Sequence, residues 1–182
     1  MDVQETEIEK LPDALIHEPL NWLFAEHYRH RQLCKLMSDL ARNGAYDENG
    51  MAEVIHFLQH DMPLHILDEE EDLFPLLRRR ATPDDDLEHV LGVLSSEHKT
   101  DRERTTDLLA GLLKAQKDRK APSREANLRL LMTQFVAHER RHVALENAIV
   151  LPIARLRLQP SDLEALSARL AARRGRFLEG SE

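Results

Sequence analysis

Apolar residues recur every three or four positions along most of the chain, a spacing that predicts long amphipathic helices. Between Pro19 and Asn43, this spacing runs without a break and predicts a first helix. A second helix is expected over about residues 51–80. Pro63 lies inside that span and should kink or interrupt it, because proline lacks the backbone N–H that a helix interior needs.

The same pattern continues through the second half of the chain. Thr82 is suited to be the N-cap of a third helix, which is expected to reach about residue 117. A fourth helix is expected to begin behind Ser123 as its cap and to end between residues 152 and 158.

A fifth helix should open at Ser161, where the spacing Ser161-x-x-Glu164 forms a capping box. Four apolar residues of this segment fall on one stripe, and a stripe of this kind needs a surface to pack against. The stripe consists of Leu163, Leu166, Leu170 and Phe177.

Four long helices joined by short loops predict an all-α protein, an up-down-up-down four-helix bundle with an additional C-terminal helix. We expect residues 1–18 to form an N-terminal extension and residues 19–158 to form the bundle. Residues 159–182 would then be a C-terminal helix that docks on the bundle or on the second subunit of a homodimer.

Composition narrows the function further. The formal charge of −8 and the lack of a basic patch argue against a nucleic-acid partner. No apolar run approaches the roughly 20 residues that a membrane span needs, and the acidic N-terminus does not resemble a signal peptide. Cys34 is the single cysteine, so a disulfide framework is excluded. We therefore expect a cytoplasmic protein without a membrane partner, in which the ten histidines are the main hint of function.

The segment from His138 to Pro152 can be interpreted in two ways. His138, Glu139 and His142 match H-E-x-x-H, in which two histidines one helical turn apart hold zinc and the glutamate is the base of a protease. Alternatively, His142 pairs with Glu146 one turn later, and a proline follows six residues after that glutamate.

An internal repeat favours the second interpretation. Residues 65–75 and 142–152 both contain a histidine, a glutamate four positions later and a proline ten positions later. The first and third helices share a smaller echo, a Glu-His pair at 26–27 and again at 97–98. Unrelated surface histidines would not reproduce such a fixed spacing, and the protease motif leaves it unexplained.

Six side chains of this repeat should meet in one layer of the bundle. At 1.5 Å per residue, antiparallel packing places all of them roughly 12–21 Å from the same end. Four imidazoles and two carboxylates would be costly to bury alone. Two metal ions bridged by the carboxylates would offset that cost, and mixed nitrogen and oxygen ligands favour iron, with manganese or zinc as alternatives. The predicted ligands are His27, His65, Glu69, His98, His142 and Glu146.

The remaining histidines differ in their expected distance from this layer. His30 and His138 lie close enough either to bind metal directly or to support the ligands. His56 faces away from the layer, and His17 and His89 fall outside it, so ordinary surface roles are expected for them. The acidic run EEED, residues 69–72, is interpreted as a solvated charged face apart from its first glutamate.

Four segments together resemble the hemerythrin-like (HHE cation-binding) family: AEHYRHRQL, HILDEEEDLFPLL, SSEHKTDRE and HVALENAIVLP. The resemblance covers about residues 19–156. It implies a four-helix bundle around two iron ions, a non-haem di-iron centre that binds dioxygen or nitric oxide or senses iron. It also implies that the four histidines are terminal ligands and that Glu69 and Glu146 are bridging carboxylates.

Two departures from the respiratory hemerythrins bear on function. Those proteins carry two histidines one turn apart on the third helix, whereas Arg102 stands one turn after His98 here. Their fourth helix uses a histidine and an aspartate five apart, whereas His142 and Glu146 are four apart. The set is more similar to non-respiratory bacterial members of the family.

We therefore expect a non-enzymatic role, the binding of dioxygen or nitric oxide for sensing, storage, or defence against oxidative or nitrosative stress. A di-iron oxidase or peroxidase is the first alternative. The second is a metal-bearing interaction bundle without small-molecule chemistry.

Overall fold

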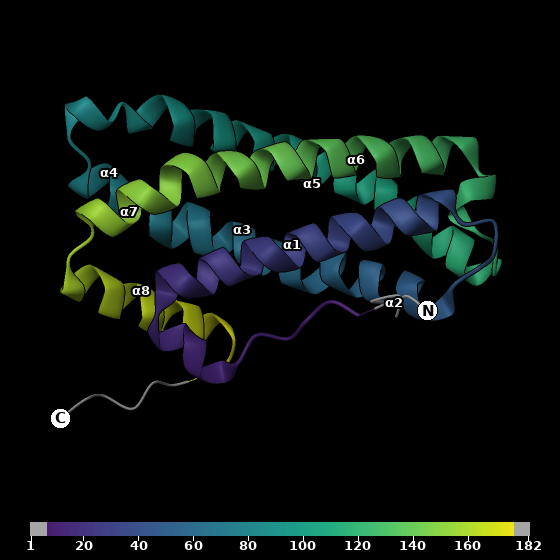
Figure 1. The fold of residues 1–182 in the computed structure, drawn as a ribbon, viewed down its shortest axis with the longest axis horizontal. Coiled ribbons are helices and arrows are strands. Elements are labelled where there is room, and N and C mark those ends of the chain that lie inside the picture. The colour runs from purple at the N-terminus through teal and green to yellow at the C-terminus, as the bar shows by residue number, and fades with distance from the viewer. Residues whose placement is uncertain (1–6, 177–182) are drawn as a thin grey trace.

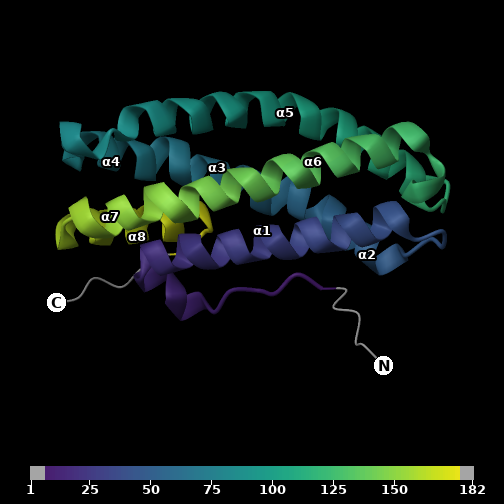
Figure 2. The ribbon, with the colours of Figure 1, turned by 45° about the horizontal axis from the view of Figure 1, so that its top comes forward.

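The computed structural model describes residues 7–176, and within them all regular structure is helical. Four long helical rods lie side by side and alternate in direction, and the shorter helix α8 packs near one end of the group (Figure 1). The same arrangement is visible after rotation, with α6 lying beside both α1 and α5 (Figure 2). The structure thus confirms the predicted up-down-up-down bundle with an additional C-terminal helix.

Two of the rods are single α-helices, and the other two combine α-helical pieces with π-helical turns. The first and third rods are α1 (Pro19–Arg42) and α5 (Leu87–Lys117). The second rod consists of α2 (Glu48–His56), a π turn (Phe57–Asp61), α3 (Met62–Leu67), a π turn (Asp68–Leu73) and α4 (Phe74–Arg80). The fourth rod consists of α6 (Ala126–Leu145), a π turn (Glu146–Val150) and α7 (Leu151–Arg157). Within residues 7–176, no helix is long and apolar enough to cross a bilayer.

Two helix starts differ from the prediction by a few residues. Thr82 caps a short 3-10 turn, in which its backbone N–H donates to Asp85 Oδ2 at 2.7 Å, and α5 begins only after that turn. Ser123 does not cap α6. Its hydroxyl donates instead to the carbonyl of Asn43 at 2.6 Å, which ties this loop to the end of α1.

The C-terminal helix α8 (Pro160–Arg173) begins one residue earlier than expected, so the predicted capping box was wrong. The box is formed by Gln159 and Asp162, with the backbone N–H of Gln159 donating to Asp162 Oδ2 at 2.9 Å. Ser161 and Glu164 are exposed.

Helix α8 docks on the bundle through the predicted apolar stripe. Leu166 and Leu170 are completely buried, and Leu163 packs against the same apolar cluster. Phe177, the last residue of the predicted stripe, lies outside the described residues. The hydroxyl of Ser167 donates to the carbonyl of Ile16, so the helix is also tied to the segment that precedes α1.

Each proline inside a rod stands just after a π turn: Pro63, Pro75 and Pro152. In each case the residue before the proline donates its N–H to the carbonyl five residues earlier. A proline inside an α-helix cannot donate and clashes with the carbonyl four residues earlier. The wider π turn relieves that clash, so the second rod remains helical through Pro63, where we had expected a kink or a break.

The apolar core is divided into two clusters by a layer of buried polar side chains. One cluster includes Leu33, Met37 and Leu112, and the other includes Leu23 and Phe74. The layer between them consists of His27, His30, His65, Glu69, His98, Glu139, His142 and Glu146, none of which is more than 5% exposed. Burial of so many polar groups is costly unless each finds a partner, which marks this layer as the functional region of the bundle.

Candidate metal centre

All six predicted ligands meet in this polar layer. They come from every rod: His27 from α1, His65 and Glu69 from the second rod, His98 from α5, and His142 and Glu146 from the fourth rod. Their ligand atoms form two groups of four, each within 4.8 Å: His27, His65, Glu69 and Glu146, and Glu69, His98, His142 and Glu146. The two glutamates belong to both groups.

Glu69 directs its two carboxylate oxygens toward different histidines. Its Oε1 lies 3.6 Å from His27 Nε2 and 3.5 Å from His65 Nε2. Its Oε2 lies 3.4 Å from His98 Nε2. The two oxygens of this carboxylate thus face two different sets of imidazole nitrogens.

Glu146 repeats this arrangement from the opposite rod. Its Oε2 lies 3.2 Å from His27 Nε2, and its Oε1 lies 3.2 Å from His142 Nε2. The Nε2 atoms of His98 and His142 are 3.1 Å apart. Two imidazole nitrogens this close, with carboxylate oxygens on either side, form a compact set of ligand atoms.

Several buried atoms of this set have no hydrogen-bond partner among the described residues. They are Nε2 of His27, both ring nitrogens of His65, Oε2 of Glu69 and both carboxylate oxygens of Glu146. Each buried polar atom left unpaired costs about 1–3 kcal/mol. Imidazole nitrogens and carboxylate oxygens are ligands that iron accepts, so the chemistry of these atoms fits bound metal.

Three of the four histidines have their outer ring nitrogen held by an oxygen atom. The Nδ1–H of His27 donates to Asn147 Oδ1 at 2.7 Å, that of His98 to Glu70 Oε1 at 2.6 Å, and that of His142 to Glu97 Oε2 at 2.8 Å. Such a bond fixes the tautomer in which the Nε2 lone pair faces the centre.

Sequence reasoning did not identify these three acceptors. Glu70, Glu97 and Asn147 each stand next to a predicted ligand in the sequence. Neighbouring residues on a helix point in directions about 100° apart, so each of them reaches a ligand on a different rod. The repeated Glu-His pairs at 26–27 and 97–98 were the available signal in the sequence, and of the three acceptors they could have identified Glu97.

Burial disfavours the protonated form of the four histidines predicted as ligands, but at three of them the nearby carboxylates outweigh it. Despite burial, Glu69 and Glu146 raise the pKa of His27 to about 9. Neighbouring carboxylates raise the pKa of His98 to about 9 and, through Glu146 above all, that of His142 to about 11. In the absence of metal, the carboxylates therefore favour protonation of the rings that face them.

The other three ligands show the remaining electrostatic conflict. Burial lowers the pKa of His65 well below its usual value. Burial, together with the negative charge of Glu69, raises the pKa of Glu146. Burial also opposes ionisation of Glu69, but the surrounding imidazoles hold its pKa well below the usual range. Two carboxylates that compete in one buried space are stabilised by added cations.

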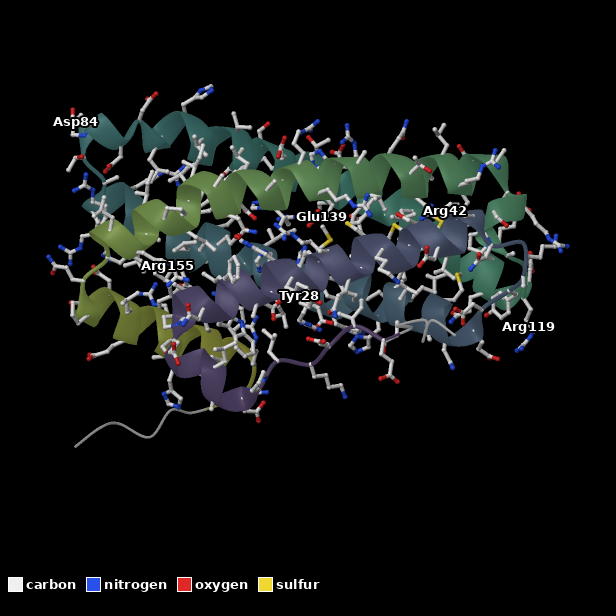
Figure 3. All side chains as sticks on the ribbon, in the orientation of Figure 1. Tyr28, Arg42, Asp84, Arg119, Glu139 and Arg155 are labelled. Carbon is white, nitrogen blue, oxygen red and sulfur yellow. The ribbon has the colours of Figure 1, made fainter. Side chains whose placement is uncertain are left out.

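The structure separates the members of the H-E-x-x-H motif. Glu139 lies between α6 and α1 (Figure 3), where its Oε1 accepts the Nδ1–H of His30 at 2.5 Å. His138 points to α5 and donates from Nε2 to Asp101 Oδ2 at 2.8 Å. Only His142 of this motif faces the paired carboxylates.

His30 lies at the edge of the centre. Its ring centroid is 4.5 Å from that of His65, and these two histidines and Glu26 form a further group of ligand atoms within 4.8 Å. Nε2 of His30 and Oε2 of Glu26 have no partner among the described residues. His30 and the half-buried His138 thus keep both of their expected roles, direct binding of metal or support of the ligands.

The residues that the sequence set aside lie elsewhere. His17, His56 and His89 are exposed. Cys34 is buried in an apolar cluster, where burial raises the pKa of its thiol to about 12. A thiol with so high a pKa is a poor nucleophile and a poor metal ligand at neutral pH.

We expect Glu139→Gln to retain the metal and to lose roughly 1 kcal/mol of unfolding free energy, because a charge-assisted hydrogen bond to His30 becomes a neutral one. Metal analysis and urea unfolding of the variant check both parts. Loss of the metal in a folded Glu139→Gln protein would show that this glutamate belongs to the centre.

A bundle with paired His–Glu clusters in its core defines a class, the metal-binding helical proteins. The Hemerythrin HHE cation binding domain matches residues 18–154, most of the chain, and the protein therefore belongs to the hemerythrin family. Members of this family typically bind iron, and with it small ligands such as dioxygen. Among individual curated proteins, none matches the chain.

Proposed function

We propose that this protein is a non-haem di-iron protein that binds dioxygen or nitric oxide, in sensing, storage, or defence against oxidative or nitrosative stress. The observation that carries the proposal is the division of the oxygens of Glu69 and Glu146 between two pairs of histidines. In this proposal His27 and His65 hold one ion. His98 on α5 and His142 on α6 hold the second ion.

The proposed site lies within a functional bundle of residues 19–158. Residues 1–18 would then be an extension, and residues 159–182 a separate element that docks on the bundle.

Ferrous iron held by these residues would supply electrons to a diatomic ligand. The part played by the chain is to hold the imidazoles in place and to exclude water. Phe74 stacks on the ring of His98 with a centroid distance of 6.0 Å and an interplanar angle of 12°. Leu23, Leu91 and Leu94 are completely buried in the adjoining apolar cluster, which limits the access of water from that side.

The presence of arginine at position 102 favours a role in ligand binding over a role in reversible oxygen carriage. It stands one turn after His98 and is exposed. Arginine stays protonated and has no lone pair to donate, so it cannot act as the second histidine ligand that respiratory hemerythrins have on this helix. The chain therefore offers fewer ligands on α5, which favours direct access for a small molecule.

The test is metal analysis of the full chain after anaerobic reconstitution with ferrous iron. We expect both proposed positions to fill and near-ultraviolet absorption to appear on oxidation. His89→Ala, which changes an exposed histidine, should bind iron like the wild type. A folded protein that takes up no iron would contradict the proposal, and uptake of a single ion would contradict its di-iron part.

A further inference from the structure

A network of ion pairs connects α8 to the π turn that carries Glu69. Asp68 and Asp72 flank Glu69 within that turn and are 0% and 2% exposed. The sequence had suggested a solvated charged face for residues 69–72, and for Asp72 this interpretation was wrong. These two carboxylates are buried because α8 covers them.

All four oxygens of the two aspartates face arginines from the C-terminal end of α8. Asp72 Oδ1 lies 2.9 Å from Arg169 Nη1, and Asp72 Oδ2 lies 2.8 Å from Arg173 Nη1. Asp68 Oδ2 lies 2.7 Å from Arg174 Nη2, and Asp68 Oδ1 pairs with Arg173. Arg173 thus joins both aspartates, one on each side of Glu69 in the sequence.

The arginines are held in place by the bundle in turn. The guanidinium of Arg174 lies over the ring of Trp22 on α1, 5.0 Å from its centroid. The match to the hemerythrin domain ends at residue 154, and α8 begins at Pro160. The network therefore joins a segment outside the matched domain to the turn that presents a predicted metal ligand.

We propose that Arg169, Arg173 and Arg174 are positioning residues for Glu69. By neutralising and holding Asp68 and Asp72, they fix the rotation of the π turn and therefore the direction in which the Glu69 carboxylate points. The inference rests on the proposed function, because it takes Glu69 to be a bridging ligand.

The physical reason is the cost of an unpaired buried charge. A carboxylate that loses its cationic partner in a buried position is strongly destabilised and moves toward water. Movement of Asp68 or Asp72 toward solvent would rotate the turn they share with Glu69. The coupling is reciprocal, so metal bound to Glu69 should also tighten the docking of α8.

A second effect has the opposite sign and makes the test decisive. Removal of an arginine leaves extra negative charge near the centre, and by Coulomb attraction alone this would strengthen the binding of a cation. Positioning predicts weaker binding. The direction of the change therefore distinguishes the two effects.

The experiment measures ferrous-iron affinity of the full chain by anaerobic competition with a chelator. We expect Arg173→Ala to weaken binding roughly 10–100-fold, as is usual when a residue that orients a metal ligand is removed. Arg173→Lys keeps the charge but not the forked geometry, so its iron affinity should fall between those of the wild type and Arg173→Ala. The matched control is Arg157→Ala, which breaks a 2.8 Å pair with Asp85 in the turn before α5.

Hydrogen exchange of the metal-free proteins gives an independent measurement. We expect Arg173→Ala to speed exchange of the amides of residues 68–74, with α2 and α6 unchanged. If Arg173→Ala folds poorly, Arg169→Ala serves instead, because Arg169 is largely exposed and forms an ion pair with Asp72.

The outcomes separate the two proposals. Unchanged or tighter iron binding in the arginine variants, or unchanged exchange of the π turn, would overturn this inference alone. Absence of iron binding in the wild type would overturn the proposed function.

Discussion

Glu146→Ala is expected to lose both metal ions, even though four histidines and Glu69 remain in place. Its two oxygens face His27 on one side and His142 on the other, so its removal takes one ligand from each proposed ion at once. We expect the affinity for ferrous iron to fall by more than about 100-fold, beyond the usual effect of a residue that only supports a ligand. Metal analysis after dialysis, compared with the wild type, measures the loss.

Glu139→Gln and Glu146→Gln form the matched pair for this experiment. Both residues are buried glutamates on the fourth rod, and each substitution keeps the size of the side chain. Iron at a hundredfold excess over Kd should stabilise the wild type and Glu139→Gln by about 2.7 kcal/mol for each ion bound, and Glu146→Gln by much less. Equal stabilisation of the three proteins would contradict the assignment of Glu146 as a ligand.

The location of the polar layer could be predicted because it depends on spacing along the chain. A histidine and a glutamate four apart share one face of a helix, and His65-Glu69 and His142-Glu146 repeat this spacing on two rods. Antiparallel packing of the rods then determines which residues lie at the same height along the bundle axis. The repeat was also sufficient to separate His142 from the H-E-x-x-H motif.

The π turns could not be predicted from this spacing, although their signal was present. The prolines at the end of each repeat were recognised only as a shared feature. In the structure, Phe74 and Leu151, which precede them, donate to the carbonyls of Glu69 and Glu146 themselves. The extra residue in each π turn rotates all later side chains of the rod about the helix axis. A regular helical spacing of apolar residues does not predict this local change.

Partners supplied from distant parts of the chain were beyond sequence reasoning. His30 and Glu139 are 109 positions apart, and Arg173 reaches Asp68 over 105 positions. Each of these residues is polar and would be placed on the surface by its type alone. These residues become buried because tertiary packing brings each of them against a partner of complementary charge or hydrogen-bonding capacity.

The reaction with dioxygen should distinguish this protein most clearly from an oxygen carrier. We expect the ferrous protein to be oxidised irreversibly by dioxygen and to bind nitric oxide readily, because α5 contributes one predicted ligand, His98, to the proposed centre. Stopped-flow spectroscopy of the reduced protein mixed with each gas measures both reactions. Recovery of the ferrous spectrum when oxygen is removed under vacuum would contradict this and restore reversible carriage.

The role of position 102 can be tested with a pair of variants. Residues four apart on a helix have Cβ atoms about 5–6 Å apart, so Arg102→His places a new imidazole one turn from His98. We expect it to slow oxidation about tenfold, a change of about 1.4 kcal/mol in the barrier. Arg102→Ala is the control and should oxidise like the wild type, because the arginine side chain is exposed and its own charge is not needed at the centre. Equal rates in all three proteins would show that the ligand missing from α5 does not control the reaction, whereas slowing in Arg102→Ala alone would assign control to the arginine itself.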